Sequence, residues 1–282
     1  MKLYTGDLSP YSAKVRMQIY AMGIQDALSF DLPVQFMMGK MNEVSPIGRI
    51  PVLEVDEGLI PESEVIAEYL DERFPDKALT GGSLKERADV RVVSRIADIY
   101  LMNNIFMSLS QANPETRVQA VLDLLIGQVR RGIGALEHHI GGGEFAVGDS
   151  LTRADCTLVP ALWMCSSTVP RLGFDSPIKS GTRVASYWDK IQNNAFAVKI
   201  LDEMNRGMKA RLDGTERKLA EAAIARAQAK PVSRGYWTTF SERPVEWCVS
   251  KKPLACLGHV SLLCLALSAS LHLLRTAIDA VC

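Results

Sequence analysis

The first part of the chain combines the patterns of strands and helices. Residues 2–5 predict a short strand, and residues 29–32 alternate polar and hydrophobic side chains as a second strand does. Residues 51–60 contain two strand patterns around an Asp-Glu-Gly turn, which predicts a hairpin. Helical spacing of apolar residues predicts a helix over 12–22 and another that begins at Ser63 and ends before a Phe-Pro pair.

Strand patterns give way to helical ones after a linker over residues 76–84. Helices are predicted over residues 85–110, 115–140, 152–164 and 182–208. In the second of these, apolar residues recur every three or four positions from Val118 to Ile140, as on the buried face of an amphipathic helix. The chain therefore predicts an α/β domain over residues 1–75 and an all-α helical bundle over residues 85–210.

Charge and cysteine content narrow the function classes. The chain has 32 Lys plus Arg and 32 Asp plus Glu, so no net field attracts nucleic acid or anionic lipid. The 6 cysteines form no Cys-x-x-Cys pair, so we expect neither a disulfide framework nor a metal site. The N-terminal residues predict a strand and not an apolar signal segment, which favours a cytoplasmic location. A small-molecule function fits this composition.

The extension over residues 211–282 differs from the rest of the chain. It begins with an alanine-rich, charged stretch and then loses any clear pattern. Residues 254–274 carry no charge and are long enough to cross a bilayer, between Lys251-Lys252 and Arg275. Three interpretations stay open: an extension that is poorly ordered or not part of the fold, a membrane anchor, or a packing extension of the helical domain.

The segment Ser9-Pro10-Tyr11-Ser12 lies where the first strand meets the first helix. Backbone amides at a helix N-terminus stabilise an anion such as a thiolate, and a serine hydroxyl adds a hydrogen bond. The alternative is that Ser9 only caps the helix beside a proline, as serine often does.

Two further motifs open secondary-structure elements of the first domain. Ile50-Pro51 begins a strand, where a cis bond would turn the Ile50 backbone outward to pair with an extended peptide; the alternative is an ordinary trans proline. Glu62-Ser63 opens a helix, where hydroxyl, amide and carboxylate together can bind the carboxylate and ammonium of a substrate. The alternative there is a plain helix cap.

A fourth motif in the helical half is structural. Thr152 and Asp155 have the spacing of a capping box that anchors a helix in the core. With these four motifs in this order, the sequence over residues 1–210 resembles the glutathione transferase family. The resemblance implies a thioredoxin-like N-terminal domain that binds glutathione, followed by an all-helical domain that supplies the pocket for the second substrate.

The resemblance also implies a role for each motif residue. Ser9 would hydrogen-bond the glutathione sulfur as the catalytic residue, with Tyr11 and Ser12 as alternatives. The residues implied to bind glutathione are Arg49, Ile50, Pro51, Glu62 and Ser63. Among them, Arg49 stands where many relatives have lysine or glutamine and would meet the glycyl carboxylate, while Glu62 and Ser63 would hold the γ-glutamyl end.

The second substrate is expected between the domains, against the helix over residues 85–110. The candidate pocket residues are Tyr100, Asn103, Phe106 and Met107. The alternative is that Phe106 and Met107 lie in the core or in a dimer interface. The acceptor itself is expected to be a small electrophile with hydrophobic character.

Glutathione is the expected co-substrate, and no metal is expected. Relatives with cysteine at position 9 use a protein thiol to act as reductases, and this first domain has none. The resemblance therefore favours conjugation by a homodimeric detoxification enzyme, with glutathione-dependent isomerisation, dehalogenation or ether cleavage as variants. The alternative from another class is a non-catalytic interaction or regulatory module with the same fold.

Overall fold

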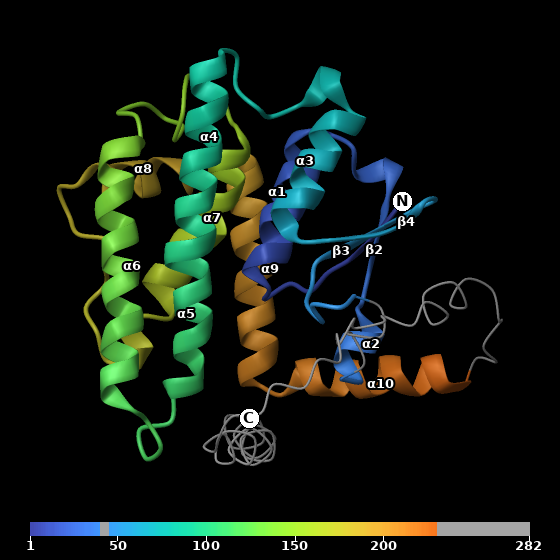
Figure 1. Ribbon diagram of the computed structural model, residues 1–282. Helices are drawn as coiled ribbons and strands as arrows, with labels where there is room; N and C mark the ends of the chain where they lie inside the picture. Colours follow the sequence, from blue (N-terminus) through green and yellow to red (C-terminus); the bar gives the residue numbers. More distant parts are fainter. Residues whose placement is uncertain (40–44, 230–282) are drawn as a thin grey trace, which may run out of the picture. The chain divides into compact units, whose positions relative to one another are not determined.

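A computed structural model describes residues 1–39 and 45–229, and its first domain is built on a small mixed sheet (Figure 1). The strands are β1 (Lys2–Tyr4), β2 (Ser29–Asp31), β3 (Val52–Val55) and β4 (Gly58–Pro61). Their order in the sheet is β2-β1-β3-β4, with β1 parallel to β2 and antiparallel to β3, and with β3 and β4 antiparallel. The predicted hairpin is therefore confirmed.

Two helices pack on this sheet. They are α1 (Pro10–Ala21) and α3 (Ser63–Arg73), and the short elements η1 (Gln25–Ala27) and α2 (Val34–Met37) complete the domain. Val15 and Ile19 of α1, Ile66 and Leu70 of α3, and Leu53 of β3 are fully buried in one cluster. Because these side chains recur every three or four positions on each helix, one face of each helix lies on the sheet.

The second domain is helical throughout, as predicted. Its helices are α4 (Leu84–Ile96), η4 (Ala97–Met102), α5 (Asn103–Ser108), α6 (Gln119–His139), α7 (Arg153–Ser167), α8 (Arg183–Ile191) and α9 (Ala195–Leu212). Short 3-10 turns, η3 (Pro75–Lys77), η5 (Leu109–Gln111) and η6 (Pro170–Leu172), connect some of these elements. The α/β plus all-α fold class is therefore confirmed.

The prediction of one helix over residues 182–208 is wrong. The chain forms α8 and α9 there, with a break after Ile191. The Asn194 side chain accepts a hydrogen bond from the Phe196 backbone N–H at 3.0 Å and so caps α9. Asparagine offers the backbone this local alternative to a continuing helix, which periodicity alone does not reveal.

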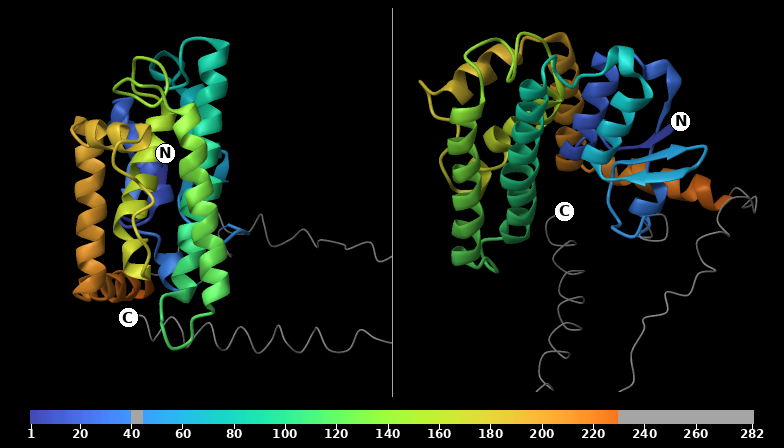
Figure 2. Two further views of the ribbon diagram at one scale, coloured as in Figure 1. Left: turned by 90° about the vertical axis from the view of Figure 1, so that its left-hand side faces the viewer. Right: turned by 45° about the horizontal axis from the view of Figure 1, so that its top comes forward.

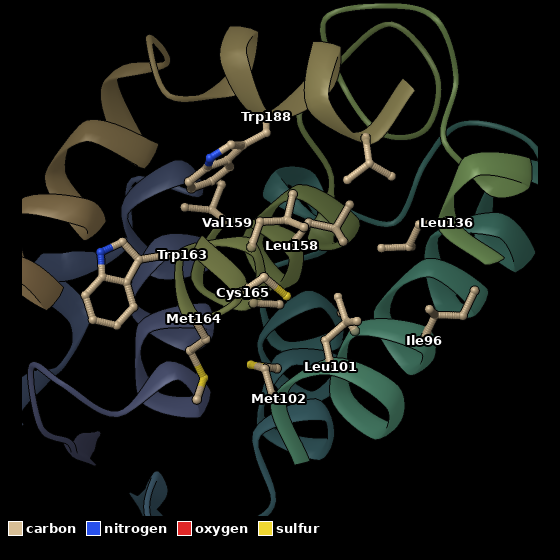
Figure 3. Packing of buried hydrophobic residues seen from close by; sticks show 14 of the residues in the cluster. Ile96, Leu101, Met102, Leu136, Leu158, Val159, Trp163, Met164, Cys165 and Trp188 are labelled. Atoms are coloured by element: carbon tan, nitrogen blue, oxygen red, sulfur yellow. The ribbon is translucent and has the colours of Figure 1, made fainter. Parts of the chain in front are cut away.

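The core of the helical domain surrounds α7 (Figure 3). Every residue of α7 from Arg153 to Cys165 is buried. Leu158 and Cys165 lie in the same cluster as Leu101 of η4 and Leu136 of α6. A helix surrounded by other elements has no polar face, so the amphipathic pattern that marks α6 does not mark α7.

Helix α1 belongs to both hydrophobic cores. Its Ala13 and Met17 join the cluster of the helical domain, while its Val15 and Ile19 face the sheet. On one side α1 contacts α3, and on the other it contacts α7 and α9 (Figure 2). The two domains therefore share one helix, and residues near its N-terminus are fixed by contacts from both.

The chain after the helical bundle forms one more described helix. Helix α9 ends at Leu212, Gly214 adopts φ +74, and α10 follows over Thr215–Ala229. Within residues 1–39 and 45–229, none of the helices has the length and apolar character that a membrane span requires. The uncharged segment 254–274 lies outside the described residues.

The capping box at the start of α7 is present and buried. The Asp155 carboxylate accepts hydrogen bonds from the backbone N–H groups of Thr152 and Ala146, both at 2.8 Å, and from the Tyr187 hydroxyl at 3.0 Å. Burial raises the pKa of Asp155, while these donors act in the opposite direction. Asp155 thus ties α7 to α8 and to the loop before it.

Replacement of Asp155 is expected to destabilise the protein. Asp155→Ala removes four buried hydrogen bonds, including the capping bond from the Thr152 backbone N–H, which together cost about 2–4 kcal/mol of the free energy of unfolding. Urea unfolding followed by circular dichroism measures this loss. Asp175→Ala is the control, because the Asp175 side chain is 90% exposed and approaches Lys179 only to 3.9 Å. Equal midpoints for the two variants would contradict a structural role for Asp155.

Candidate functional site

The predicted glutathione-binding residues surround one cavity of about 240 Å³. It is lined by Tyr11, Ser45, Ile47, Arg49, Ile50, Pro51, Pro61, Glu62, Ser63, Glu64, Arg95, Asp98, Ile99 and Asn103. The first ten come from the α/β domain, and the last four come from α4, η4 and the first residue of α5. The cavity therefore lies between the two domains, where the second substrate was expected.

A larger depression of about 610 Å³ lies along α8. Five of its eleven lining residues carry hydroxyl groups, and Trp188, Asp189 and Lys190 line it near the end of the helix. None of the motif residues lines it. We therefore take the smaller cavity as the candidate site, because it brings together charged and polar groups from separate parts of the chain.

One side of the cavity is formed by the chain that enters β3. The Ile50–Pro51 peptide bond is cis, and both residues line the cavity. The Arg49 guanidinium carbon lies 5.5 Å from the centre of the Phe106 ring, which is a cation–π contact between the two domains. Arg49 is exposed at the cavity mouth, where it can meet an anionic ligand.

The N-terminus of α3 forms a second side. Glu62 precedes the helix with φ +70 and ψ +117, and it is the only non-glycine residue with positive φ among those described. A backbone held in this unfavourable region is often part of a binding site. Ser63 follows as the first residue of the helix and lines the cavity, at the end of α3 where backbone amides of the first turn have no partner within the helix.

The three residues predicted at the sulfur have different surroundings. Ser9 caps α1, and its Oγ accepts a hydrogen bond from the Ser12 backbone N–H at 3.3 Å. Tyr11 lines the cavity, whereas Ser9 and Ser12 do not. Ser12 is fully buried, and its hydroxyl has no hydrogen-bond partner among the described residues.

The Tyr11 hydroxyl donates a long hydrogen bond of 3.4 Å to the backbone oxygen of Asp98. Burial and the nearby Asp98 carboxylate raise the pKa of Tyr11, and Arg49 and Arg95 act in the opposite direction. The phenol therefore stays protonated at neutral pH and serves as a hydrogen-bond donor at the cavity wall.

Only some of the residues predicted to bind the second substrate lie at the cavity. Of the four predicted acceptor residues, Asn103 lines the cavity, and Phe106 contacts it through Arg49. Tyr100 does not line the cavity, and its Cβ lies beside Gly132 of α6, where an added Cβ would come within 2.7 Å of it. Met107 is exposed outside the cavity lining.

Arg95, Asp98 and Ile99 are cavity residues that were not predicted from the sequence. These residues line the cavity from the end of α4 and from η4, which is a π-helical turn inside an otherwise α-helical segment. A signal was present, because Arg95, Ile99 and Asn103 are four residues apart and so share one face of a helix. Inserted π turns are common at functional sites, but no residue pattern marks this one.

The match to family models decides the family of the chain. Residues 3–78 match the glutathione S-transferase N-terminal domain, and residues 96–191 match the glutathione S-transferase C-terminal domain. The chain belongs to the glutathione S-transferase family. The two matches fall on the two sides of the cavity and contain all of its lining residues except Arg95, which lies just before the second match.

Individual glutathione S-transferase relatives differ in their described roles. A maleylacetoacetate isomerase of Pseudomonas aeruginosa is 34% identical over 176 residues, which is 58% of this chain and 80% of the relative. A probable elongation factor 1-gamma 2 of Arabidopsis thaliana is 26% identical over 197 residues, 70% of this chain and 47% of the relative. The chain thus spans about half the length of this elongation factor.

A solved structure supports the transferase fold. The glutathione S-transferase of Methylobacterium radiotolerans in complex with glutathione sulfonate has a TM-score of 0.59 and 20% sequence identity. The match covers 70% of this chain and 92% of that protein. In the part of this chain that the structure describes, no group of three or more His, Cys, Asp or Glu side chains could hold a metal ion.

A buried ion cluster lies beneath the transferase cavity. Lys14 of α1, with a side chain 1% exposed, pairs with Glu64 of α3 and, at 2.9 Å, with Asp98 of η4. Arg153 of α7 pairs with Asp71 at 2.9 Å and approaches Glu64 to 3.5 Å. Although burial opposes ionisation, Lys14 and then Arg153 lower the pKa of Glu64 overall. The cluster joins both domains directly behind two cavity-lining carboxylates.

Loss of Lys14 is expected to destabilise this transferase-family protein strongly. Lys14→Met leaves Glu64 and Asp98 buried without their cation, which costs about 3–5 kcal/mol of the free energy of unfolding. In the variant, burial raises the pKa of both carboxyls, so protonation relieves the unpaired charge and the deficit shrinks as the pH falls. Urea unfolding over a range of pH measures both effects.

The matched control is Lys85→Met. The Lys85 side chain is 80% exposed and pairs with Asp89 in the next turn, a kind of pair worth about 0.3–0.5 kcal/mol. This variant should unfold close to the wild type at every pH. A Lys14→Met deficit that did not change with pH would contradict the electrostatic explanation.

Proposed function

We propose that this protein is a glutathione transferase that activates the glutathione thiol for attack on a small electrophile. The supporting observation is that one cavity gathers Arg49, Ile50, Glu62 and Ser63 from separate segments, with Tyr11 and the α1 N-terminus beside them. A scaffold role requires none of these side chains to meet. The Methylobacterium radiotolerans neighbour, which is in complex with glutathione sulfonate, supports glutathione as the ligand.

In the proposed complex, each end of glutathione meets a complementary group. The γ-glutamyl carboxylate binds the Ser63 hydroxyl and the backbone amides that begin α3, and the Glu62 carboxylate binds the ammonium group. The glycyl carboxylate binds the Arg49 guanidinium, and the backbone of Ile50 pairs with the cysteinyl residue. This orientation directs the sulfur toward the N-terminus of α1.

Ser9 is the proposed group that stabilises the thiolate. Its Oγ accepts from the Ser12 N–H, so its own hydrogen remains available to donate to sulfur. A free thiol has a pKa of about 8.5, and a hydrogen bond to the charged form lowers it by roughly one to two units. The positive end of α1 adds to this effect. Tyr11 and Ser12 are the alternative donors.

The proposed reaction is conjugation. The thiolate attacks the electrophilic carbon, a carbon–sulfur bond forms, the leaving group departs with its bonding electrons, and the thiol proton passes to solvent. The first domain has no cysteine, so a mixed disulfide with the protein is not part of the route. Isomerisation, the reaction named for the Pseudomonas aeruginosa relative, is a variant with the same thiolate.

An interaction module is the second candidate. It is favoured by the similarity to the elongation factor 1-gamma of Arabidopsis thaliana, whose name describes a component of translation and not a transferase. Under this alternative no glutathione-dependent turnover of an electrophile is required, whether or not the cavity binds glutathione. Absence of glutathione uptake in isothermal titration calorimetry at millimolar concentration would exclude the transferase, and turnover of an aromatic halide with glutathione would exclude the module.

The role of Ser9 predicts a specific change in the bound thiol. Ser9→Ala should raise the pKa of bound glutathione by roughly one to two units, because one hydrogen bond to the thiolate is lost. Thiolate absorbance in the ultraviolet, followed against pH, measures this shift. The conjugation rate at neutral pH should fall about tenfold and recover as the pH rises, because a higher pH restores the thiolate.

Tyr11→Phe is the matched variant for this experiment. It removes the other hydroxyl near the sulfur and should leave the pKa of the bound thiol close to that of the wild type. A shift in Tyr11→Phe with none in Ser9→Ala would assign the thiolate donor to Tyr11 and overturn the role of Ser9. Calorimetry with glutathione confirms that both variants still bind it.

We also propose a homodimer, with the first domain of one subunit against the helices of the other. Exposed apolar side chains on both domains support it: Val65 of α3, Val92 of α4 and Leu124 of α6. Sedimentation should give twice the chain mass of 31.0 kDa. Val92→Lys with Leu124→Lys should release monomers, whereas Val198→Lys on α9 should not. Sedimentation of the wild type at the chain mass would contradict the dimer.

A further inference from the structure

The cavity wall formed by α4, η4 and α5 has its own chemical character. Arg95, Ile99 and Asn103 lie along one side of this helical segment, and all three line the cavity. They present, in order, a guanidinium, an apolar side chain and an amide. Such a wall complements a ligand that carries a negative charge as well as an apolar part.

The other charged groups of the cavity are either paired within the protein or assigned to glutathione in the proposed complex. Lys14 donates to Asp98 at 2.9 and 3.1 Å and also pairs with Glu64, so both carboxylates face a buried cation. Arg49 stacks on Phe106, and the proposed complex assigns it to the glycyl carboxylate of glutathione. Glu62 and Ser63 are likewise assigned to the γ-glutamyl end.

Arg95 is the cavity cation to which the proposed complex assigns no group of glutathione. Its closest ionic contact among the described residues is Asp98, at 3.9 Å, which is beyond hydrogen-bond distance. The Arg95 side chain is 56% exposed, so solvent reaches its donors. A guanidinium has five N–H donors arranged to bind a carboxylate in a bidentate manner.

Tyr11 lines the same cavity as Arg95. Burial is the main cause that raises the pKa of Tyr11, and Arg49 and Arg95 both oppose it, so the phenol lies within electrostatic reach of the two cations. An acceptor placed beside Tyr11 therefore meets a protonated hydroxyl and Arg95. The Asn103 amide, one turn beyond Ile99, adds a further hydrogen-bond donor.

We infer that the second substrate of the proposed glutathione transferase carries a carboxylate or a similar anionic group, which binds to Arg95 with help from Asn103. The apolar part of the substrate lies against Ile99, with its electrophilic carbon toward the glutathione sulfur. This inference rests on the proposed function and names its substrate class. It differs from the hydrophobic acceptor that the sequence led us to expect.

The test compares two acceptors that differ at one ring substituent, with each rate divided by the uncatalysed rate because the two substituents activate the ring differently. Chlorodinitrobenzoate and chlorodinitrobenzamide share the reacting carbon and the chloride leaving group, but only the first is an anion. The wild type should prefer the benzoate by about tenfold in kcat/KM, mainly through KM, since a charge-assisted pair with an arginine contributes at least that much. Arg95→Gln should abolish the preference, and Arg95→Lys should restore part of it.

Arg91→Gln is the matched control. Arg91 lies one turn earlier on α4, is exposed, and approaches Glu68 to 3.9 Å outside the cavity. Arg91→Gln also removes one positive charge from α4, so it measures how much of the benzoate preference comes from general electrostatic attraction of the anion. The benzoate preference should persist in this variant, and its disappearance there would overturn the specific role of Arg95.

Calorimetry with glutathione alone separates this inference from the proposed function. A wild type that does not bind glutathione fails the proposed function and with it the inference. A wild type that binds glutathione and uses both acceptors equally, or prefers the benzamide, retains the proposed function and overturns the inference. Loss of glutathione affinity in Arg95→Gln would assign Arg95 to glutathione and would also overturn it.

Discussion

The burial of helix α1 on every side is the constraint on which the rest of the structure depends. Lys14, Arg16 and Gln18 are each at most 2% exposed, so their polar groups need partners within the protein. Lys14 pairs with α3 and η4, and Arg16 pairs with Glu203 of α9 at 2.7 Å. The partners of α1 therefore come from both domains. A hydrophobic helix would fill the same space, but it would not fix one arrangement of its neighbours in this way.

These same partners are part of the cavity walls. Glu64 and Asp98 each line the cavity and each pair with Lys14 behind it. The distance between the α3 N-terminus and the η4 wall is thus set by one buried ammonium group. A change in this pairing therefore alters the stability of the fold and the geometry of the binding site together, because the same carboxylates serve both.

The sequence predicted the parts of the fold whose cause is local. Alternation and an Asp-Glu-Gly turn marked the hairpin, periodic apolar residues marked α6, and Thr152 with Asp155 marked the start of α7. Features that depend on contacts between distant parts of the chain were not predicted from the sequence. Lys14 and Arg16 resemble exposed positions of a helix, since only the packing of a second domain buries them. The four-residue spacing of Arg95 and Ile99 places them on one helix face, but only the packing of the two domains sets that face opposite Ser63 across the cavity.

The relatives within this family share the fold while their names describe different roles, and the structure suggests where such differences arise. Asp155 and Lys14 are buried and serve packing, so they specify the scaffold and touch no ligand site directly. Arg49, Arg95 and Asn103 line the cavity with side chains that reach solvent, so their replacement costs the fold little. Binding specificity can therefore change at these positions while the scaffold persists. The proposed recognition of an anionic acceptor by Arg95 depends on such a replaceable side chain.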